Sequence, residues 1–149
     1  MWSDGAFATY LKNSLIVTGG SLVVILVCAL GAGFILGRYQ FKGSTIIFGF
    51  ILTGMLIPAK LAILPLFIQL KWMNLIDSHI GLILVYASGA LPAAVFIMSG
   101  FFRSLPSDLD SAARIDGASE FQLLTRVLVP LVRPGMAIVA IYSAIPIWN

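Results

Sequence analysis

The feature that most constrains this chain is a run of twenty-five residues, Asn13 to Gly37, without a charged side chain. Wound as an α-helix, the run is roughly 37 Å long and can cross a bilayer core of about 30 Å. A helix that is apolar on every side requires lipid or a large protein core around it, so the run predicts a membrane span. The spacing Gly33-x-x-x-Gly37 also predicts close packing against another helix.

Three more apolar runs follow the first one. The chain is 60% apolar and 10% charged, whereas soluble domains average about 45–50% apolar and about 25% charged. A chain of 149 residues is too short to bury that excess in a soluble core. We expect Pro58 and Pro65 to break the second run, because proline removes a helical hydrogen bond. The predicted fold class is all-α integral membrane, with about four transmembrane helices at residues 13–37, 43–59 with a broken continuation to 70, 78–102 and 127–149.

Basic residues are distributed unequally between the two sides of the predicted membrane domain. The side with more of them places the loop of residues 103–126 in the cytoplasm and both termini outside. The net charge of +3 is small and dispersed, so we expect no nucleic-acid partner. The basic residues on the loop side are Arg38, Lys42, Arg103, Arg114 and Arg126, and those on the other side are Lys12 and Lys71.

Few side chains are suited to enzyme chemistry. His79 is the single histidine and Cys28 the single cysteine, which argues against a metal site or a thiol nucleophile. A membrane-embedded enzyme would need paired carboxylates, a histidine cluster or an activated serine, and the spans contain none of these. The sequence also lacks a Gly-x-x-x-x-Gly-Lys-[Ser/Thr] phosphate loop. We therefore predict no catalytic residue, no metal and no cofactor in this chain.

The loop after the third run contains the signals of two capped helices. We expect Ser107 to cap the first one, with Asp110 completing a capping box. Gly117 ends that helix, because glycine adopts the left-handed conformation most readily. Ser119 then caps the second helix, and Gln122 completes its capping box. The pattern predicts a short helix, a tight turn and a second helix joined to the fourth span.

The same loop resembles the Glu-Ala-Ala loop of ABC importer permeases. The segment Ser111-Ala112-Ala113 is followed by three residues and Gly117, then by nine residues and Val127-x-Val129-Pro130. The wider string from Phe102 to Ser119 is similar to the carbohydrate-uptake branch, and in particular to its maltose-type second permease subunit. The resemblance covers nearly the whole chain. It implies part of an ABC type I importer permease core, with a cytoplasmic coupling-helix loop, in a multi-pass protein of the bacterial plasma membrane.

The resemblance also implies partners and site residues. In the family this loop docks on a cytoplasmic ABC ATPase dimer, which binds the ATP, while a second permease subunit, usually a different chain, and an extracytoplasmic solute-binding protein complete the importer. The family's glutamate position holds Ser111 here, so either Asp110 substitutes for that glutamate at the ATPase or the contact is lost. The implied coupling residues are Asp110, Ser111, Ala112, Ala113, Arg114, Asp116, Gly117 and Ala118.

The solute is less constrained than the partner. We expect a sugar or an oligosaccharide, and the alternatives are another small solute, such as a glycerol phosphate or an amino-acid derivative, and a truncated permease without function. Members of this branch usually have six spans, so we expect this chain to be a piece of a longer permease. Candidate substrate-pathway residues are Lys60, Tyr86, Ser88 and Asn149, although Lys60 can instead extend its ammonium group to the membrane surface.

Overall fold

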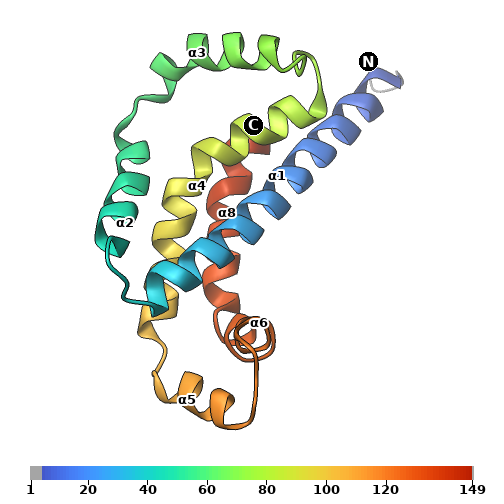
Figure 1. Ribbon diagram of the computed structural model, residues 1–149. Helices are drawn as coiled ribbons and strands as arrows, with labels where there is room; N and C mark the ends of the chain where they lie inside the picture. The colour runs from blue at the N-terminus through green and yellow to red at the C-terminus, as the bar shows by residue number, and fades with distance from the viewer. Residues whose placement is uncertain (1–4, 149) are drawn as a thin grey trace.

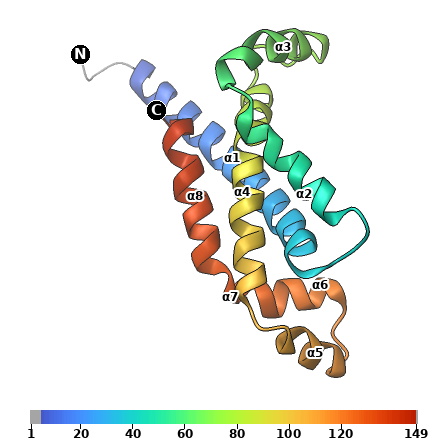
Figure 2. The same ribbon diagram turned by 90° about the vertical axis from the view of Figure 1, so that its left-hand side faces the viewer.

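The computed structural model describes residues 5–148, and all regular secondary structure in that range is helical. The expected all-α fold is confirmed. Helices α1, α4 and α8 lie side by side as a bundle, α2 lies alongside it, and α3 crosses over one end (Figures 1 and 2). The helices are α1 (Gly5–Arg38), α2 (Ser44–Thr53), the 3₁₀ turn η1 (Gly54–Leu56), α3 (Ala59–Trp72), α4 (His79–Ser104), α5 (Asp108–Ile115), α6 (Glu120–Gln122), the π-helical segment η2 (Leu123–Leu128), α7 (Val129–Leu131) and α8 (Arg133–Trp148).

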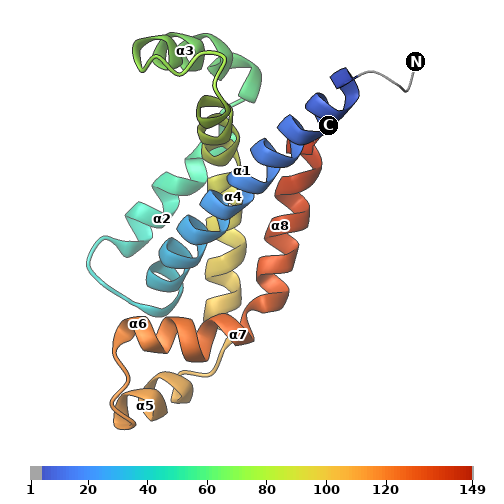
Figure 3. The same ribbon diagram turned by 90° about the vertical axis from the view of Figure 1, so that its right-hand side faces the viewer.

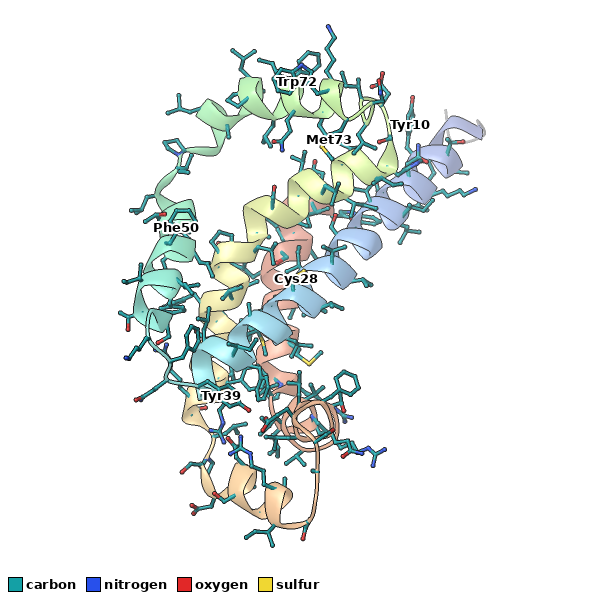
Figure 4. The ribbon with its side chains drawn as sticks, in the orientation of Figure 1. Tyr10, Cys28, Tyr39, Phe50, Trp72 and Met73 are labelled. Atoms are coloured by element: carbon teal, nitrogen blue, oxygen red, sulfur yellow. The ribbon has the colours of Figure 1, made fainter. Side chains whose placement is uncertain are left out.

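Helices α1 and α4 are each long and apolar enough to cross a membrane, α1 from Phe7 to Arg38 and α4 over its whole length. Two bent pairs bring the number of crossings to four if each pair forms one span. One pair joins α2 and η1 to α3 with a bend of 104°, and the other joins the helices from Glu120 to Leu131 to α8 with a bend of 75°. Large apolar side chains such as Phe50, which is 77% exposed on α2 (Figure 4), are suited to contact with lipid or with other helices.

Two glycines bring α1 close to α4. A Cβ atom at Gly33 would lie 2.7 Å from Met98 Cβ, and one at Gly37 would lie 2.9 Å from both Phe102 Cβ and the Ser99 carbonyl oxygen. Any larger residue would therefore push the two helices apart. The close packing predicted from Gly33-x-x-x-Gly37 is confirmed, with α4 as the partner helix.

The two prolines of the second apolar run behave differently. Ile57 and Pro58 have extended backbone conformations, and they separate η1 from α3 as predicted. The break predicted at Pro65 is wrong, because Pro65 lies inside α3. A proline within a helix removes one hydrogen bond, and here the hydrogen bonds of the turns around it are sufficient for α3 to continue.

The fourth apolar run, for which we predicted a span over residues 127–149, contains a bend. Val132 leaves the helical conformation, with φ −91° and ψ 10°, and α8 begins after it at Arg133. Pro130 and Pro134 flank this point and cannot donate backbone hydrogen bonds. The segment from Glu120 to Leu131 therefore turns away from α8 and lies across the end of the bundle (Figure 3).

Candidate coupling site

Helices α5 and α6 lie below one end of the bundle, at the same end as the link between α1 and α2 (Figure 3). Gly117 joins them with φ +80°, the left-handed conformation that the sequence predicted. The Gly117 N–H donates to the Arg114 carbonyl at 3.1 Å, and the Ala118 N–H donates to the Ala113 carbonyl at 2.9 Å. These two bonds form a Schellman motif, which satisfies the last carbonyls of α5 and fixes the direction of the turn.

The two predicted capping boxes have different outcomes. At α6 the Gln122 N–H donates to Ser119 Oγ at 3.3 Å, and the Ser119 N–H donates to Gln122 Oε1 at 2.9 Å, so this capping box is confirmed. At α5 the predicted box is wrong, because Ser107 makes no side-chain capping bond. Asp110 does not reach back to Ser107, since a stronger, charged partner holds it.

That partner is Arg38, the last residue of α1. Its Nε donates to Asp110 Oδ2 at 3.0 Å, and its Nη2 forms an ion pair with Asp110 Oδ1. The same guanidinium donates to the carbonyl oxygens of Phe102 at 3.1 Å, Leu105 at 2.6 Å and Pro106 at 2.9 Å. An arginine has five N–H donors, and these five contacts use them all. The side chains of Arg38 and Asp110 are only 6% and 14% exposed. We call this cluster the Arg38 clamp.

A second arginine makes the reciprocal contact. Arg103, near the end of α4, donates to the Leu36 carbonyl of α1 at 3.1 Å, and its guanidinium lies 4.9 Å from the centre of the Phe48 ring. An arginine of α1 therefore donates to carbonyl groups at the C-terminal end of α4, and an arginine of α4 donates to one at the C-terminal end of α1. Carbonyl groups in the last turn of a helix lack hydrogen-bond partners within their own helix. The close approach at Gly37 makes this exchange possible, because it brings the two helix ends together.

Tyr39, the residue after α1, makes a second connection to the loop. Its hydroxyl donates to a carboxylate oxygen of Glu120, and Arg114 donates to the Tyr39 hydroxyl at 3.2 Å and to Glu120 Oε1 at 3.1 Å. Figure 4 shows Tyr39 at the end of α1 that faces α5 and α6. Burial and the neighbouring Glu120 carboxylate raise the pKa of Tyr39 above its ordinary value. This group is more exposed than the Arg38 clamp, with Arg114 and Glu120 side chains 46% and 57% exposed.

The outer side of α5 is open to solvent. Ser111 and Ala112 are exposed, Asp116 lies exposed at the C-cap, and Ile115 is 86% exposed. Ala113 instead faces inward and is 8% exposed, as part of the hydrophobic core. We call Ser111, Ala112, Ile115 and Asp116 the outer face of α5. Sequence reasoning missed Ile115, although its position three residues after Ala112 places it on the same side of the helix.

Several predicted site residues are not on this outer face. The Asp110 carboxylate is paired with Arg38 in the Arg38 clamp, and Arg114 is paired with Glu120 in the Tyr39 group. Ala113 packs the inner side of α5 against the hydrophobic core, while Gly117 and Ala118 form the terminal turn of α5. From the sequence, Arg38 contributed only a positive charge on the loop side, and Tyr39 had no predicted role. The signal for Arg38 was its position directly after Gly37, a helix-packing glycine.

The predicted substrate-pathway residues are dispersed. Lys60 is exposed in the first turn of α3, Tyr86 is half-buried in α4, and Ser88 is exposed and donates to the Val85 carbonyl at 2.8 Å. Asn149 lies outside the described residues. A surface cavity of about 510 Å³ along one side of α3 contains none of them, since it is lined by Leu64, Pro65, Ile68, Gln69 and Trp72. Within residues 5–148 no group of acidic, histidine or cysteine side chains is arranged to hold a metal ion.

Comparison with known proteins identifies the family. The model of the family described as "Binding-protein-dependent transport system inner membrane component" matches residues 29–149, which include α4, the loop and α8. The chain belongs to this family. A member of the family is an inner-membrane transport component and not an enzyme, as the sequence predicted.

Individual relatives agree with this assignment. The diacetylchitobiose uptake system permease protein of Streptomyces coelicolor is 40% identical over 148 residues, which are 99% of this chain and 49% of the relative. The trehalose transport system permease protein of Mycobacterium tuberculosis is 36% identical over 143 residues, 96% of this chain and 52% of the relative. A solved structure of a bacterial ABC transporter involved in the import of alginate, an acidic polysaccharide, matches with a TM-score of 0.87 at 26% identity and covers 99% of this chain and 51% of that one. The chain thus spans about half the length of these relatives.

Proposed function

We propose that this chain forms part of the permease subunit of an ATP-driven sugar importer, and that the outer face of α5 binds a cytoplasmic ABC ATPase. The observation that carries the proposal is the arrangement of α5. The helix is closed by the Gly117 turn, its inner side is held to the bundle through Asp110 and Ala113, and its outer side is free. A short helix with two small residues and one large apolar residue on its free side is suited to insertion into a groove of a partner.

The partners follow from the family. The importer would contain an ATPase dimer that binds ATP, a second permease subunit that differs from this one, and an extracytoplasmic binding protein that delivers the solute. Closure of the ATPase dimer would move α5 and switch the paired permeases between inward-facing and outward-facing states. The basic residues at the α5 end of the bundle support a cytoplasmic location for this end.

The names of the relatives support a saccharide as the solute. Two relatives are named for diacetylchitobiose and trehalose, and the similar solved structure is named for alginate import. All three are sugars built from more than one unit, so we propose an oligosaccharide for this transporter. Lys60, Tyr86, Ser88 and Asn149 stay candidates for the substrate pathway, to be tested by uptake once the solute is identified.

Copurification tests the docking proposal. The tagged chain, expressed in its host and extracted in mild detergent, is expected to carry an ABC ATPase with it. Ala112→Trp and Ile115→Asp place a bulky or charged side chain on the outer face of α5 and should reduce the copurified ATPase by about tenfold or more. Lys42→Trp is the matched control, because Lys42 is exposed at the same end of the bundle but lies in the link between α1 and α2.

Two outcomes would contradict the proposal. Absence of an ATPase from the wild-type preparation would refute the role in an ATP-driven importer. Normal ATPase recovery with both α5 variants would move the docking site elsewhere. For the solute, uptake into proteoliposomes containing the purified complex should be saturable with an oligosaccharide such as trehalose or diacetylchitobiose, and glycerol phosphate should not compete.

A further inference from the structure

We propose that the Arg38 clamp is the mechanical connection through which movement of α5 reaches α1 and α4, so that Arg38 and Asp110 are needed for coupling and not for ATPase docking. This inference rests on the proposed function. It assigns a role to two residues that lie behind the outer face of α5.

The first argument is the completeness of the clamp. All five N–H donors of Arg38 have partners, two on the Asp110 carboxylate and three on carbonyls in the last turn of α4 and in the link after it. Both side chains are shielded from solvent. A buried charge pair with every donor satisfied holds one geometry, because any displacement leaves a charged group without a partner in a medium of low dielectric constant.

The second argument is the connectivity of the fold. By the backbone, α5 is joined to α4 only through the short link of residues 105–107, and to α8 only through the Gly117 turn and the bent segment from Glu120 to Val132. The clamp adds a direct connection from the first turns of α5 to the last residue of α1. Since α1 and α4 are in close contact at Gly33 and Gly37, a force on Asp110 acts on both helices as one body.

The third argument is the separation between the clamp and the outer face of α5. Asp110 is turned inward to Arg38, whereas Ser111, Ala112 and Ile115 are exposed. A substitution at Asp110 can therefore break the connection and leave the outer face in place. A merely structural role predicts a different result, namely that docking and coupling are lost together.

The experiment compares three variants in the complete transporter, purified with the ATPase that accompanies the wild-type chain and reconstituted in proteoliposomes. Asp110→Asn removes the charge at nearly constant size, Asp110→Glu retains it, and Glu120→Gln weakens the exposed Tyr39 group as the matched control. The readouts are the amount of copurified ATPase and the amount of oligosaccharide imported per ATP hydrolysed.

We expect Asp110→Asn to keep its ATPase and to lose import per ATP by about tenfold or more. Asp110→Glu should recover most of the loss, and Glu120→Gln should change import per ATP by less than about twofold. If Asp110→Asn does not insert in the membrane, Asp110→Glu still decides. Its longer side chain does not fit the saturated cluster fully, so import per ATP should be measurably lower than in the wild type and in Glu120→Gln, with the amount of copurified ATPase unchanged.

Two results overturn the inference alone. The first is wild-type import per ATP in Asp110→Asn, and the second is a parallel loss of ATPase and import, which would make the clamp a purely structural contact. A wild-type chain that recovers no ATPase would instead refute the proposed function, and this inference with it.

Discussion

Gly37 allows the contact between α1 and α4 to be tested quantitatively. In Gly37→Ala the new Cβ would lie 2.9 Å from Phe102 Cβ and from the Ser99 carbonyl oxygen, whereas ordinary contacts begin at 3.4 Å. At these distances the neighbouring atoms of α4 must shift, and overpacking of this kind costs about 1–3 kcal/mol. Alanine also favours the helix over glycine by up to about 1 kcal/mol, so the steric cost is partly hidden in the single variant.

Gly31→Ala in the same helix removes this ambiguity. A Cβ atom at Gly31 would have nothing within 4 Å, so that variant reports the helix-propensity gain without the steric cost. The difference between the two variants should therefore be about 1–3 kcal/mol in the free energy of unfolding, with Gly37→Ala the less stable. The free energy is measured on the purified full chain by titrating mixed micelles with SDS and following helix content by circular dichroism. Equal stability changes at Gly31 and Gly37 would refute the close contact.

Three further predictions concern the loop. Ser119→Ala should cost about 1 kcal/mol of local stability, seen as faster amide hydrogen exchange at Gln122, and unchanged exchange would contradict the capping box. Gly117→Val should be about 1–2 kcal/mol less stable than Gly117→Asn in thermal unfolding, because asparagine tolerates positive φ better, and equal melting temperatures would speak against the left-handed turn. Because the pKa of Tyr39 is raised, its contribution to the free energy of unfolding is complete below the ordinary pKa of 10.0 and is lost as pH rises through the raised pKa. In an ultraviolet titration, Glu120→Gln should lower the pKa of Tyr39 part of the way, since burial remains as the larger cause.

The elements that depend on near neighbours could be predicted from the sequence. The Ser119 capping box and the left-handed Gly117 are set by residues within one or two turns, and both are present. The capping box at Ser107 failed for the opposite reason. Its acceptor Asp110 is paired with Arg38, which is 72 positions away in the sequence, and an ion pair with two hydrogen bonds outcompetes one bond to a backbone N–H.

The candidate site was predicted in outline and not in detail. The spacing from Ser111 to Pro130 identified the loop, but it did not tell which side of α5 faces outward. That depends on the position of α1, which the apolar pattern of Asn13 to Gly37 does not specify because it has no polar side. Ala113 therefore proved to be buried and Ile115 exposed. Pro65 shows the same limit for chain breaks, since the sequence marks the lost hydrogen bond and not the strength of the surrounding helix.

The π-helical segment from Leu123 to Leu128 gives the loop tolerance to the loss of one residue. Both leucines are fully buried, although in an α-helix residues five apart point about 140° away from each other. The wider winding holds one additional residue per turn and brings both onto one side. Deleting a single residue here would restore α-helical winding and leave the chain that follows close to its present rotation, because the wider winding already holds that additional residue. A deletion within α8 would instead rotate the residues after it by about 100° about the helix axis, and side chains such as Val139 and Ser143, which are buried in the bundle, could not all stay buried.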